Sequence, residues 1–316
     1  MASDNEARVA VYIDFDNILI SRYDQLHGRG AFHSDKVRTL PVDGRESKVR
    51  TRFGEATVDL GAIIDYASSY GSIVLSRAYA DWSVPAHAAY REQLLARAVD
   101  LVQLFPTTRA LKNGADIRLA VDVVEDLFRL DDVSHVVIVA GDSDYIALAQ
   151  RAKRLGKFVV GIGVAGSTSK SLAAACDEFA DYDALPGVER VVVQDETDAD
   201  TSEPAAAEEA APAAKSRRRR RKSGGSSGDE EAAPELSPDD AATGLLERAL
   251  RILTQKTDDE WLHANVVKEQ MKRMDPVFNE KSLGHKSFSD FVGARDALVE
   301  LREDGQARLL RLKQAG

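Results

Sequence analysis

Short apolar runs alternate with amphipathic segments through residues 1–187. The runs are Val9–Ile13, Ile73–Leu75 with Ala78–Ala80, Leu101–Phe105, Val136–Ala140 and Phe158–Ile162. Strands that alternate with helices are typical of βαβ units, which build a parallel sheet with helices on both faces. The run VVIVA is apolar throughout, as expected for a strand buried on both faces. The pattern predicts an α/β domain with a doubly wound parallel sheet of five strands.

One helical segment carries a continuous apolar stripe. A helix that starts near Gly114 places four apolar residues on one face at about 100° per residue: Ile117, Val121, Val124 and Phe128. We expect this stripe to be buried against the sheet. Asp116 then lies on one flank and Asp122 on the other.

A second patterned region occupies residues 243–316. Apolar positions at helical spacing mark three short helices, which contain Leu246, Leu250 and Leu253, then Val266, Val267, Met271 and Met274, then Phe288, Phe291 and Val292. After Leu298–Leu301, a turn at Asp304-Gly305 leads into ARLLRL, which predicts a small β-hairpin. Three helices and a hairpin indicate a small α+β domain of the winged helix-turn-helix kind.

Residues 188–242, between these regions, have no hydrophobic periodicity. They are rich in Ala, Pro, Glu, Ser and Gly, which is typical of a disordered linker. The linker holds an acidic stretch, Asp195–Glu209, and a basic block that begins with Arg217, Arg218 and Arg219. Such a block suits sequence-independent phosphate binding, or nuclear import, although a merely solvated run stays open.

A polar insertion, residues 25–53, follows the first strand. It contains Arg38, Arg45, Lys48, Arg50 and Arg52. The insertion is too long for an ordinary connection, so it is either a functional flap or a disordered, solvated loop.

Composition excludes several classes of protein. A chain of 316 residues is long enough for two folded units. Its one cysteine, Cys176, excludes an internal disulfide and fits a reduced cytosolic thiol. The N-terminus lacks a basic start and an apolar segment, and no apolar run approaches the roughly 20 residues of a membrane helix. We therefore expect a cytoplasmic protein without membrane contact.

Acidic residues follow several predicted strands. Asp14 ends the first strand, Asp81 follows the second, and Asp142 and Asp144 follow the fourth. The carboxyl ends of parallel strands share one edge of the sheet, where ligands bind in open α/β folds. Asp116, in the first turn of its helix, is expected to join this edge.

Gathered carboxylates need a counter-charge. Two unit charges about 4 Å apart repel by roughly 4 kcal/mol at an effective dielectric of 20. Hard oxygen ligands select Mg²⁺ or Mn²⁺. Such an ion activates water and stabilises charge on phosphate, so the acidic edge indicates phosphodiester hydrolysis. The net charge of −10 would otherwise oppose a polyanionic partner.

Simpler roles remain open for these residues. Asp142 or Ser143 could cap the helix that begins near Tyr145, with Asp144 complementing the helix dipole. We interpret Asn17 either as a residue that supports the metal ligands or as a phosphate contact, and Asp16 as a competitor for the metal.

The hydroxyls of Ser167, Thr168 and Ser169 lie before a further predicted helix. They either donate to phosphate or cap that helix, and capping is the preferred interpretation.

The motifs VYIDFDN, RAYADW, KNGADIRLAVD, VVIVAGDSDY, GKFVVGIG and SKSLAAACDEF occur in order across Arg8–Pro186. In these motifs the region resembles NYN domains of the LabA-like group, within the PIN-like nuclease superfamily. The resemblance implies a PIN-like sheet and RNA cleavage that depends on Mg²⁺ or Mn²⁺. It places the family's acidic positions on Asp14, Asp116, Asp142 and Asp144, with Asp122 at a further family position of less certain role.

Residues 245–312 resemble an OST-HTH (LOTUS) domain, chiefly through GHKSFSDF and the order of helices and hairpin. This resemblance implies RNA binding or a protein partner and leaves a homodimer open. Lys281, His285 and Lys286 lie where a contact loop would be, although a solvated turn explains them equally well.

Two other functions compete with a ribonuclease. DFDNIL is similar to the DxDxT motif of haloacid-dehalogenase-type phosphatases, in which Asp14 would be the nucleophile and Asp16 the acid/base. Position 18 is Ile, and GDSD lacks the wider acidic spacing of those enzymes. The other competitor is a non-catalytic RNA-binding adaptor with an inactive acidic edge.

Overall fold

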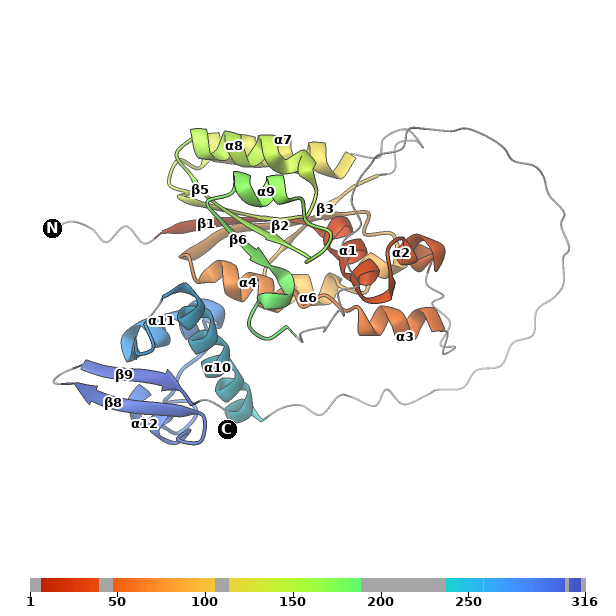
Figure 1. Cartoon of the computed structure of the whole chain (residues 1–316). Coiled ribbons are helices and arrows are strands. Elements are labelled where there is room, and N and C mark those ends of the chain that lie inside the picture. Colours follow the sequence, from red (N-terminus) through yellow and green to blue (C-terminus); the bar gives the residue numbers. More distant parts are fainter. Residues whose placement is uncertain are drawn as a thin grey trace, which may run out of the picture.

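The structure is a computed structural model that describes residues 7–39, 48–105, 114–188, 237–257, 259–304 and 307–313. Arg45, the greater part of the linker and its basic block lie outside these residues. The described residues form an N-terminal and a C-terminal domain (Figure 1). None of their helices is both long enough and apolar enough to cross a bilayer.

The N-terminal domain is built on a six-stranded sheet in which every neighbouring pair of strands is parallel. The strands are β1 (Arg8–Asp14), β2 (Ser72–Ala80), β3 (Asp100–Gln103), β4 (His135–Val139), β5 (Phe158–Gly163) and β6 (Glu178–Asp181). Their order is β3-β2-β1-β4-β5-β6, which confirms the predicted doubly wound parallel sheet. The order reverses between β1 and β4, the position at which such sheets bind ligands.

The sixth strand was not predicted. Edge strand β6 contains only four residues, and its side chains are partly buried or exposed. Because this strand is short and has no apolar run, its sequence gives no strand signal of the kind that the central strands give.

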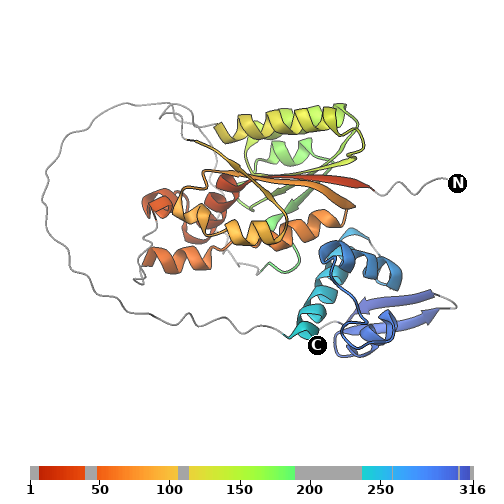
Figure 2. The same ribbon diagram turned by 180° about the vertical axis from the view of Figure 1, so that it is seen from behind.

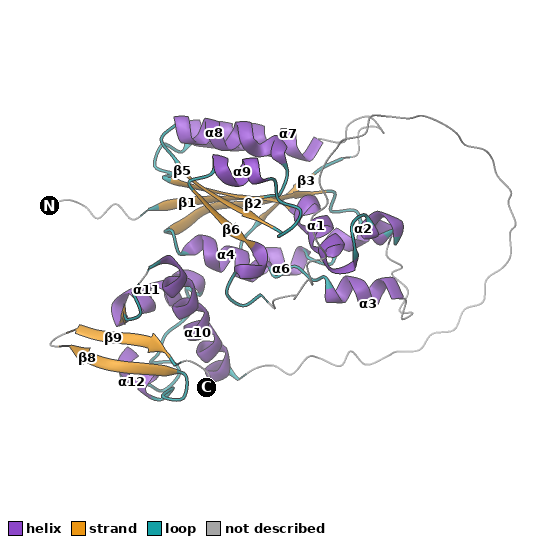
Figure 3. Ribbon diagram, viewed as in Figure 1, coloured by secondary structure: helices purple, strands orange, loops and turns teal. Residues whose placement is uncertain are grey.

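Helices cover both faces of the sheet (Figures 1 and 3). One layer contains α1 (Phe15–His27), α4 (Leu60–Ser68) and α6 (Arg91–Ala96), and the other contains α7 (Gly114–Arg129), α8 (Ile146–Arg154) and α9 (Lys170–Ala175). The shorter elements are α2 (Ala31–Ser34), α3 (Lys48–Glu55), α5 (Pro85–Ala88), η1 (Val37–Thr39), η2 (Ser143–Tyr145) and η3 (Tyr182–Ala184). Alternate residues of β1 enter the two cores: Val9, Val11 and Ile13 pack with α1 and α4, and Ala10 and Tyr12 pack with α7 and α8.

In its described part, the polar insertion is folded. It supplies α2, η1 and α3, and Val49 and Phe53 pack against the core beside α1. Arg38 forms an ion pair with Asp16 in the first turn of α1, with 2.5 Å between Nη2 and Oδ2.

The predicted orientation of α7 is wrong. Ile117, Val121 and Phe128, from the stripe that we expected to be buried, are 57%, 56% and 61% exposed. The helix instead buries its opposite face, which contains Leu119, Asp122, Val123, Asp126 and Leu127.

Two tyrosines of the sheet explain this orientation. The Tyr79 hydroxyl donates to Asp122 at 3.1 Å, and the Tyr12 hydroxyl donates to Asp126 at 3.0 Å. These hydrogen bonds offset the desolvation of the two carboxylates, so a helix face with acidic residues can be buried. Arg77 also pairs with Asp126.

The C-terminal domain has the predicted three helices and hairpin. Its elements are α10 (Pro238–Lys256), β7 (Leu262–His263), α11 (Ala264–Met274), α12 (Phe288–Gly293), β8 (Val299–Asp304) and β9 (Ala307–Leu312). The three strands form an antiparallel sheet in the order β7-β9-β8. Ser237 caps α10, so the helix begins inside the segment that we assigned to the linker.

The C-terminal domain packs against α4, so it lies beside the helix layer that contains α1, α4 and α6 (Figures 1 and 2). Asp65 of α4 is 1% exposed and pairs with Arg97 at 2.7 Å and with Arg248 of α10 at 3.3 Å. Gln270 of α11, which has no exposed surface, donates to the Ser68 hydroxyl at 3.1 Å. This contact could not be predicted from the sequence, which indicates only a tether between the domains.

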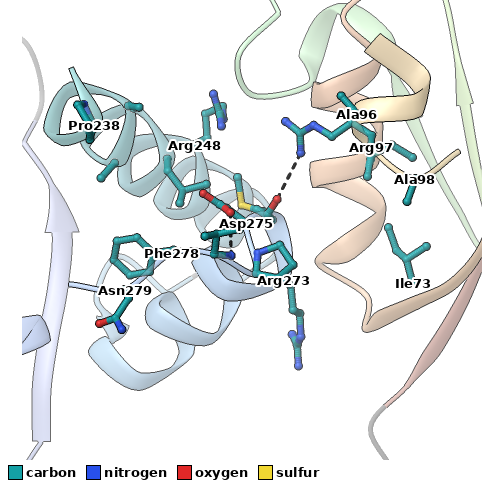
Figure 4. A pocket seen from close by; sticks show the side chains of 18 of the residues that line it. Ile73, Ala96, Arg97, Ala98, Pro238, Arg248, Arg273, Asp275, Phe278 and Asn279 are labelled. Carbon is teal, nitrogen blue, oxygen red and sulfur yellow. Dashed lines mark hydrogen bonds between the residues drawn. The ribbon is translucent and has the colours of Figure 1, made fainter. Parts of the chain in front are cut away.

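A cleft of about 1010 Å³ remains beside these contacts (Figure 4). Ile73 and Ala98 line its N-terminal wall, and Arg248 and Phe278 line its C-terminal wall. Arg97 reaches across and donates to the Met274 carbonyl at 3.3 Å. The interface is therefore partly polar and incompletely packed.

Arg248→Ala should loosen the interface, because buried Asp65 loses one of its two guanidinium partners. We expect a loss of about 1–2 kcal/mol in the free energy of unfolding, since Arg97 remains and Arg248 is partly solvated. Hydrogen exchange in α4 should accelerate. Arg251→Ala is the matched control, because Arg251 pairs with Glu247 of its own helix on the surface. Equal effects of the two substitutions would contradict the interface.

Candidate metal centre

Three carboxylates converge at the edge of the sheet where the order of strands reverses. Asp116 lies in the first turn of α7, and Asp142 and Asp144 lie in the segment that follows β4. One oxygen of each can be chosen so that all three atoms lie within 4.8 Å of one another. Asp116 is partly buried and the other two are exposed, so the group opens to solvent.

Asp14 lies beneath this group. It ends β1 and is only 2% exposed. Its Oδ1 accepts a hydrogen bond from the Asn17 amide at 3.1 Å, and its Oδ2 accepts one from the Tyr145 hydroxyl at 2.8 Å. Asp14 is therefore held at both oxygens.

Tyr145 connects the buried carboxylate to the open group, although it was not among the predicted site residues. Its hydroxyl oxygen also lies 2.9 Å from Oδ1 of Asp116, and the side chain is 1% exposed. A hydroxyl has one hydrogen, so it donates to one of the two carboxylates at a time. Its position directly after GDSD could have indicated a role in the site, but an aromatic residue at a helix start usually indicates core packing.

The pKa values of two carboxyl groups in the site are raised by burial and by neighbouring negative charges. Burial raises the pKa of Asp14 to about 8, with the nearby charge of Asp116 adding to the effect. Burial also raises the pKa of Asp116, helped by the charges of Asp142 and Asp144. A divalent cation would remove this repulsion, and carboxylate oxygens are the ligands that Mg²⁺ and Mn²⁺ prefer. The donor set thus fits such an ion.

Asn17 joins the two segments of main chain that carry Asp14 and Asp142. Its side-chain oxygen accepts a hydrogen bond from the Gly141 amide at 2.9 Å, which ties the first turn of α1 to the end of β4. The Asp142 side chain accepts from the Asp144 amide at 3.3 Å, so Asp142 caps η2 and belongs to the acidic group at the same time.

Three other acidic residues have local partners instead. Asp122, which the resemblance places at a further acidic position of the family, pairs with Arg118 at 2.9 Å and accepts from Tyr79. Asp81 accepts from the side chains of Ser83 and Gln103.

Asp16, the predicted competitor for the metal, pairs with Arg38 and lies 2.7 Å from Nε2 of buried His87. Among the described residues, the acidic group consists of Asp116, Asp142 and Asp144. Asp16, Asp81 and Asp122 therefore lie outside it.

The remaining predicted contacts are dispersed. Ser143 is exposed within η2, and Ser169 occupies the N-cap position of α9 without a side-chain capping bond. The hydroxyls of Ser167 and Thr168 donate to the Val164 carbonyl.

In the C-terminal domain, Lys281 and Lys286 lie exposed in the stretch between α11 and α12, and His285 packs edge-on against Phe291. Cys176 is buried and free, at the end of α9.

The strand order and the acidic edge define an α/β protein with a group of carboxylates at the edge of the sheet where such folds bind ligands. A family model for the NYN domain matches residues 8–183, and a model for the OST-HTH/LOTUS domain matches residues 244–310. The chain belongs to the NYN domain family and carries a C-terminal OST-HTH/LOTUS domain.

Two individual proteins are similar to this chain. An uncharacterised protein of Methanocaldococcus jannaschii is 28% identical over 128 residues, which cover 40% of this chain and 48% of that protein. The chain thus spans about half the length of this relative. A crystal structure of a protein of unknown function from Vibrio parahaemolyticus is 22% identical, with a TM-score of 0.42, and covers 57% of this chain and 96% of its own.

The raised pKa of Asp14 predicts the pH dependence of stability without metal. The folded protein keeps a proton up to about pH 8, whereas an unfolded Asp releases it near its ordinary pKa of about 3.9. The free energy of unfolding in chelator should therefore fall as pH rises between these values, by up to about 1.4 kcal/mol per pH unit. Chemical denaturation at several pH values measures this slope.

Asp14→Asn removes one titrating carboxylate and should reduce the slope, and the slope that remains should come from groups such as Asp116, whose pKa is also raised. Asp131→Asn, at an exposed turn after α7, is the control and should retain the slope. A flat profile for the unsubstituted protein would contradict the burial of an ionisable Asp14.

Proposed function

We propose that the protein is a ribonuclease that hydrolyses RNA phosphodiester bonds with Mg²⁺ or Mn²⁺. The observation that carries the proposal is the convergence of Asp116, Asp142 and Asp144 above buried Asp14. Membership of the NYN domain family, within the PIN-like nuclease superfamily, supports the same activity.

Each acidic residue has a distinct place in this proposal. Asp116, Asp142 and Asp144 would hold the cation at the open side of the group. Asp14, which is nearly inaccessible and held at both oxygens, would fix the floor of the site and add negative charge beneath the ion. When bound, the ion activates water for attack and stabilises charge on the phosphate and the leaving oxygen.

A cationic side chain beside the acidic edge is suited to the flanking phosphates of RNA. Arg38 is anchored on Asp16 in the first turn of α1, and its side chain is 46% exposed. It retains solvent-facing surface for a phosphate contact. Asn17, Asp81, Ser143 and Ser169 remain proposed substrate contacts near the same edge.

The C-terminal domain is proposed to hold RNA at a second place. Its match to the OST-HTH/LOTUS model supports this role, and exposed Lys281 and Lys286 are candidate contacts. Arg217, Arg218 and Arg219 are proposed as an additional phosphate grip.

The arrangement disfavours the phosphatase alternative. A haloacid-dehalogenase-type mechanism needs an accessible Asp14 carboxylate to attack phosphorus. Here Asp14 is 2% exposed and both of its oxygens accept hydrogen bonds. Asp16, the would-be acid/base, is paired with Arg38 and His87.

Cleavage of a panel of single-stranded and structured RNAs tests the proposal. We expect cleavage with Mg²⁺ or Mn²⁺ and none with chelator. Asp116→Asn combined with Asp142→Asn should lower the rate at least about a hundredfold while RNA binding persists. Asp131→Asn should cleave like the unsubstituted protein. RNA binding without cleavage by the unsubstituted protein would instead identify an RNA-binding adaptor.

Tyr145→Phe should weaken metal binding, because Asp116 loses the hydroxyl that orients it relative to Asp14. Loss of such a supporting hydrogen bond lowers metal affinity by about 10- to 100-fold. Titration with Mn²⁺ followed by electron paramagnetic resonance measures this change without reference to cleavage.

Tyr12→Phe is the matched control for the Tyr145 substitution. It removes another buried hydroxyl that donates to a carboxylate, Asp126, away from the acidic group. It should lower stability but leave Mn²⁺ affinity unchanged. If both substitutions change Mn²⁺ affinity equally, Tyr145 has no specific part in holding the site.

A further inference from the structure

Helix α7 has a second apolar face that points away from the sheet. Ile117, Val121 and Phe128 are each more than half exposed, and Val124 lies partly buried between them. At about 100° per residue these four side chains form one stripe, opposite the buried face of the helix. Single exposed apolar residues are ordinary on protein surfaces, whereas a continuous stripe of this kind marks an interaction site.

We propose that this stripe, defined as Ile117, Val121, Val124 and Phe128, joins two copies of the chain through an antiparallel pair of α7 helices. The spacing of the stripe is four, three and four residues, which is the spacing of helices that pack side by side. The proposal does not depend on ribonuclease activity.

The stripe is complementary to itself about a two-fold axis between Val121 and Val124. In this arrangement Ile117 lies against Phe128 of the second copy, and Val121 lies against Val124 of the second copy. Each contact occurs twice, as symmetry requires of an interface in which both copies use the same surface. The valines meet at the centre, where the helices approach most closely. Ile117 and Phe128, which are larger, pack against each other at both ends of the interface.

The charges beside the stripe favour the same arrangement. Arg118 and Glu125 lie on one flank, seven residues apart, with side chains 58% and 57% exposed. In the antiparallel pair, Arg118 of each copy lies near Glu125 of the other. Glu125 forms an exposed i,i+4 pair with Arg129 that contributes little and can rearrange. Arg118 pairs with buried Asp122 through Nε, and more than half of its side chain is exposed for a second partner.

These charges also distinguish a second copy from an RNA partner. A phosphate backbone requires a row of cations, whereas the flank of the stripe carries both signs and its centre is apolar. A surface with one positive and one negative group in this register fits an identical surface turned through 180°.

The expected dimer is weak. Four side chains from one helix bury less than the roughly 800 Å² per partner of a standard stable interface. We therefore expect a dissociation constant on the order of 100 µM. The dimer should form in concentrated solution and dissociate on dilution.

Sedimentation equilibrium of the full chain, from about 5 to about 500 µM, tests the proposal. The average mass of the unsubstituted protein should rise toward that of a dimer. Val121→Glu should keep the protein monomeric throughout, because it places a carboxylate at the centre of the stripe. Leu95→Glu is the matched control, because Leu95 is a 63% exposed apolar residue on α6 of the same domain. It should leave association unchanged.

A charge exchange tests the register. Glu125→Arg should weaken association about tenfold, because it places a positive charge beside Arg118 of the second copy. Adding Arg118→Glu should restore association. Circular dichroism of each variant verifies that α7 remains folded.

Three results would overturn the proposal. The unsubstituted protein could remain monomeric at every concentration, or Leu95→Glu could disrupt association as strongly as Val121→Glu. A monomer whose RNA binding is lost on Val121→Glu would assign the stripe to RNA.

Discussion

Repulsion between carboxylates is the constraint on which the candidate site depends. The parallel sheet places the ends of β1 and β4 side by side, and α7 begins at the same edge, so the main chain determines where the acidic groups lie. Folding energy from two hydrophobic cores holds the anions together, although their charges oppose it. The result is a preformed group of oxygens, and in the proposed function this arrangement would lower the cost of ordering ligands around a cation.

The parts of this arrangement that depend on apolar runs and strand ends could be predicted from the sequence. The central strands are continuous hydrophobic segments, and residues that follow parallel strands must share an edge, so the position of Asp14, Asp142 and Asp144 at one edge follows from chain order alone. The short edge strand β6 lacks such a run. Its place is set by pairing with β5, which the sequence does not reveal.

The orientation of α7 and the role of Tyr145 could not be predicted for a shared reason. A periodicity argument treats aspartate as a surface residue, but Asp122 and Asp126 are buried because tyrosines on neighbouring strands donate hydrogen bonds to them. Tyr145 likewise shows its polar role only once two distant carboxylates lie beside it. Buried polar partners come from remote parts of the chain, so the decisive information is tertiary.

The docking of the C-terminal domain has a geometric consequence for the path of a substrate. The cleft between the domains includes Ile73 near the start of β2, whereas the acidic edge lies where the strands finish. The nine residues of β2 span about 30 Å between these two ends. A nucleic acid in contact with both the docked domain and the carboxylates must therefore run along the molecule, and a very short oligonucleotide can reach only one of the two.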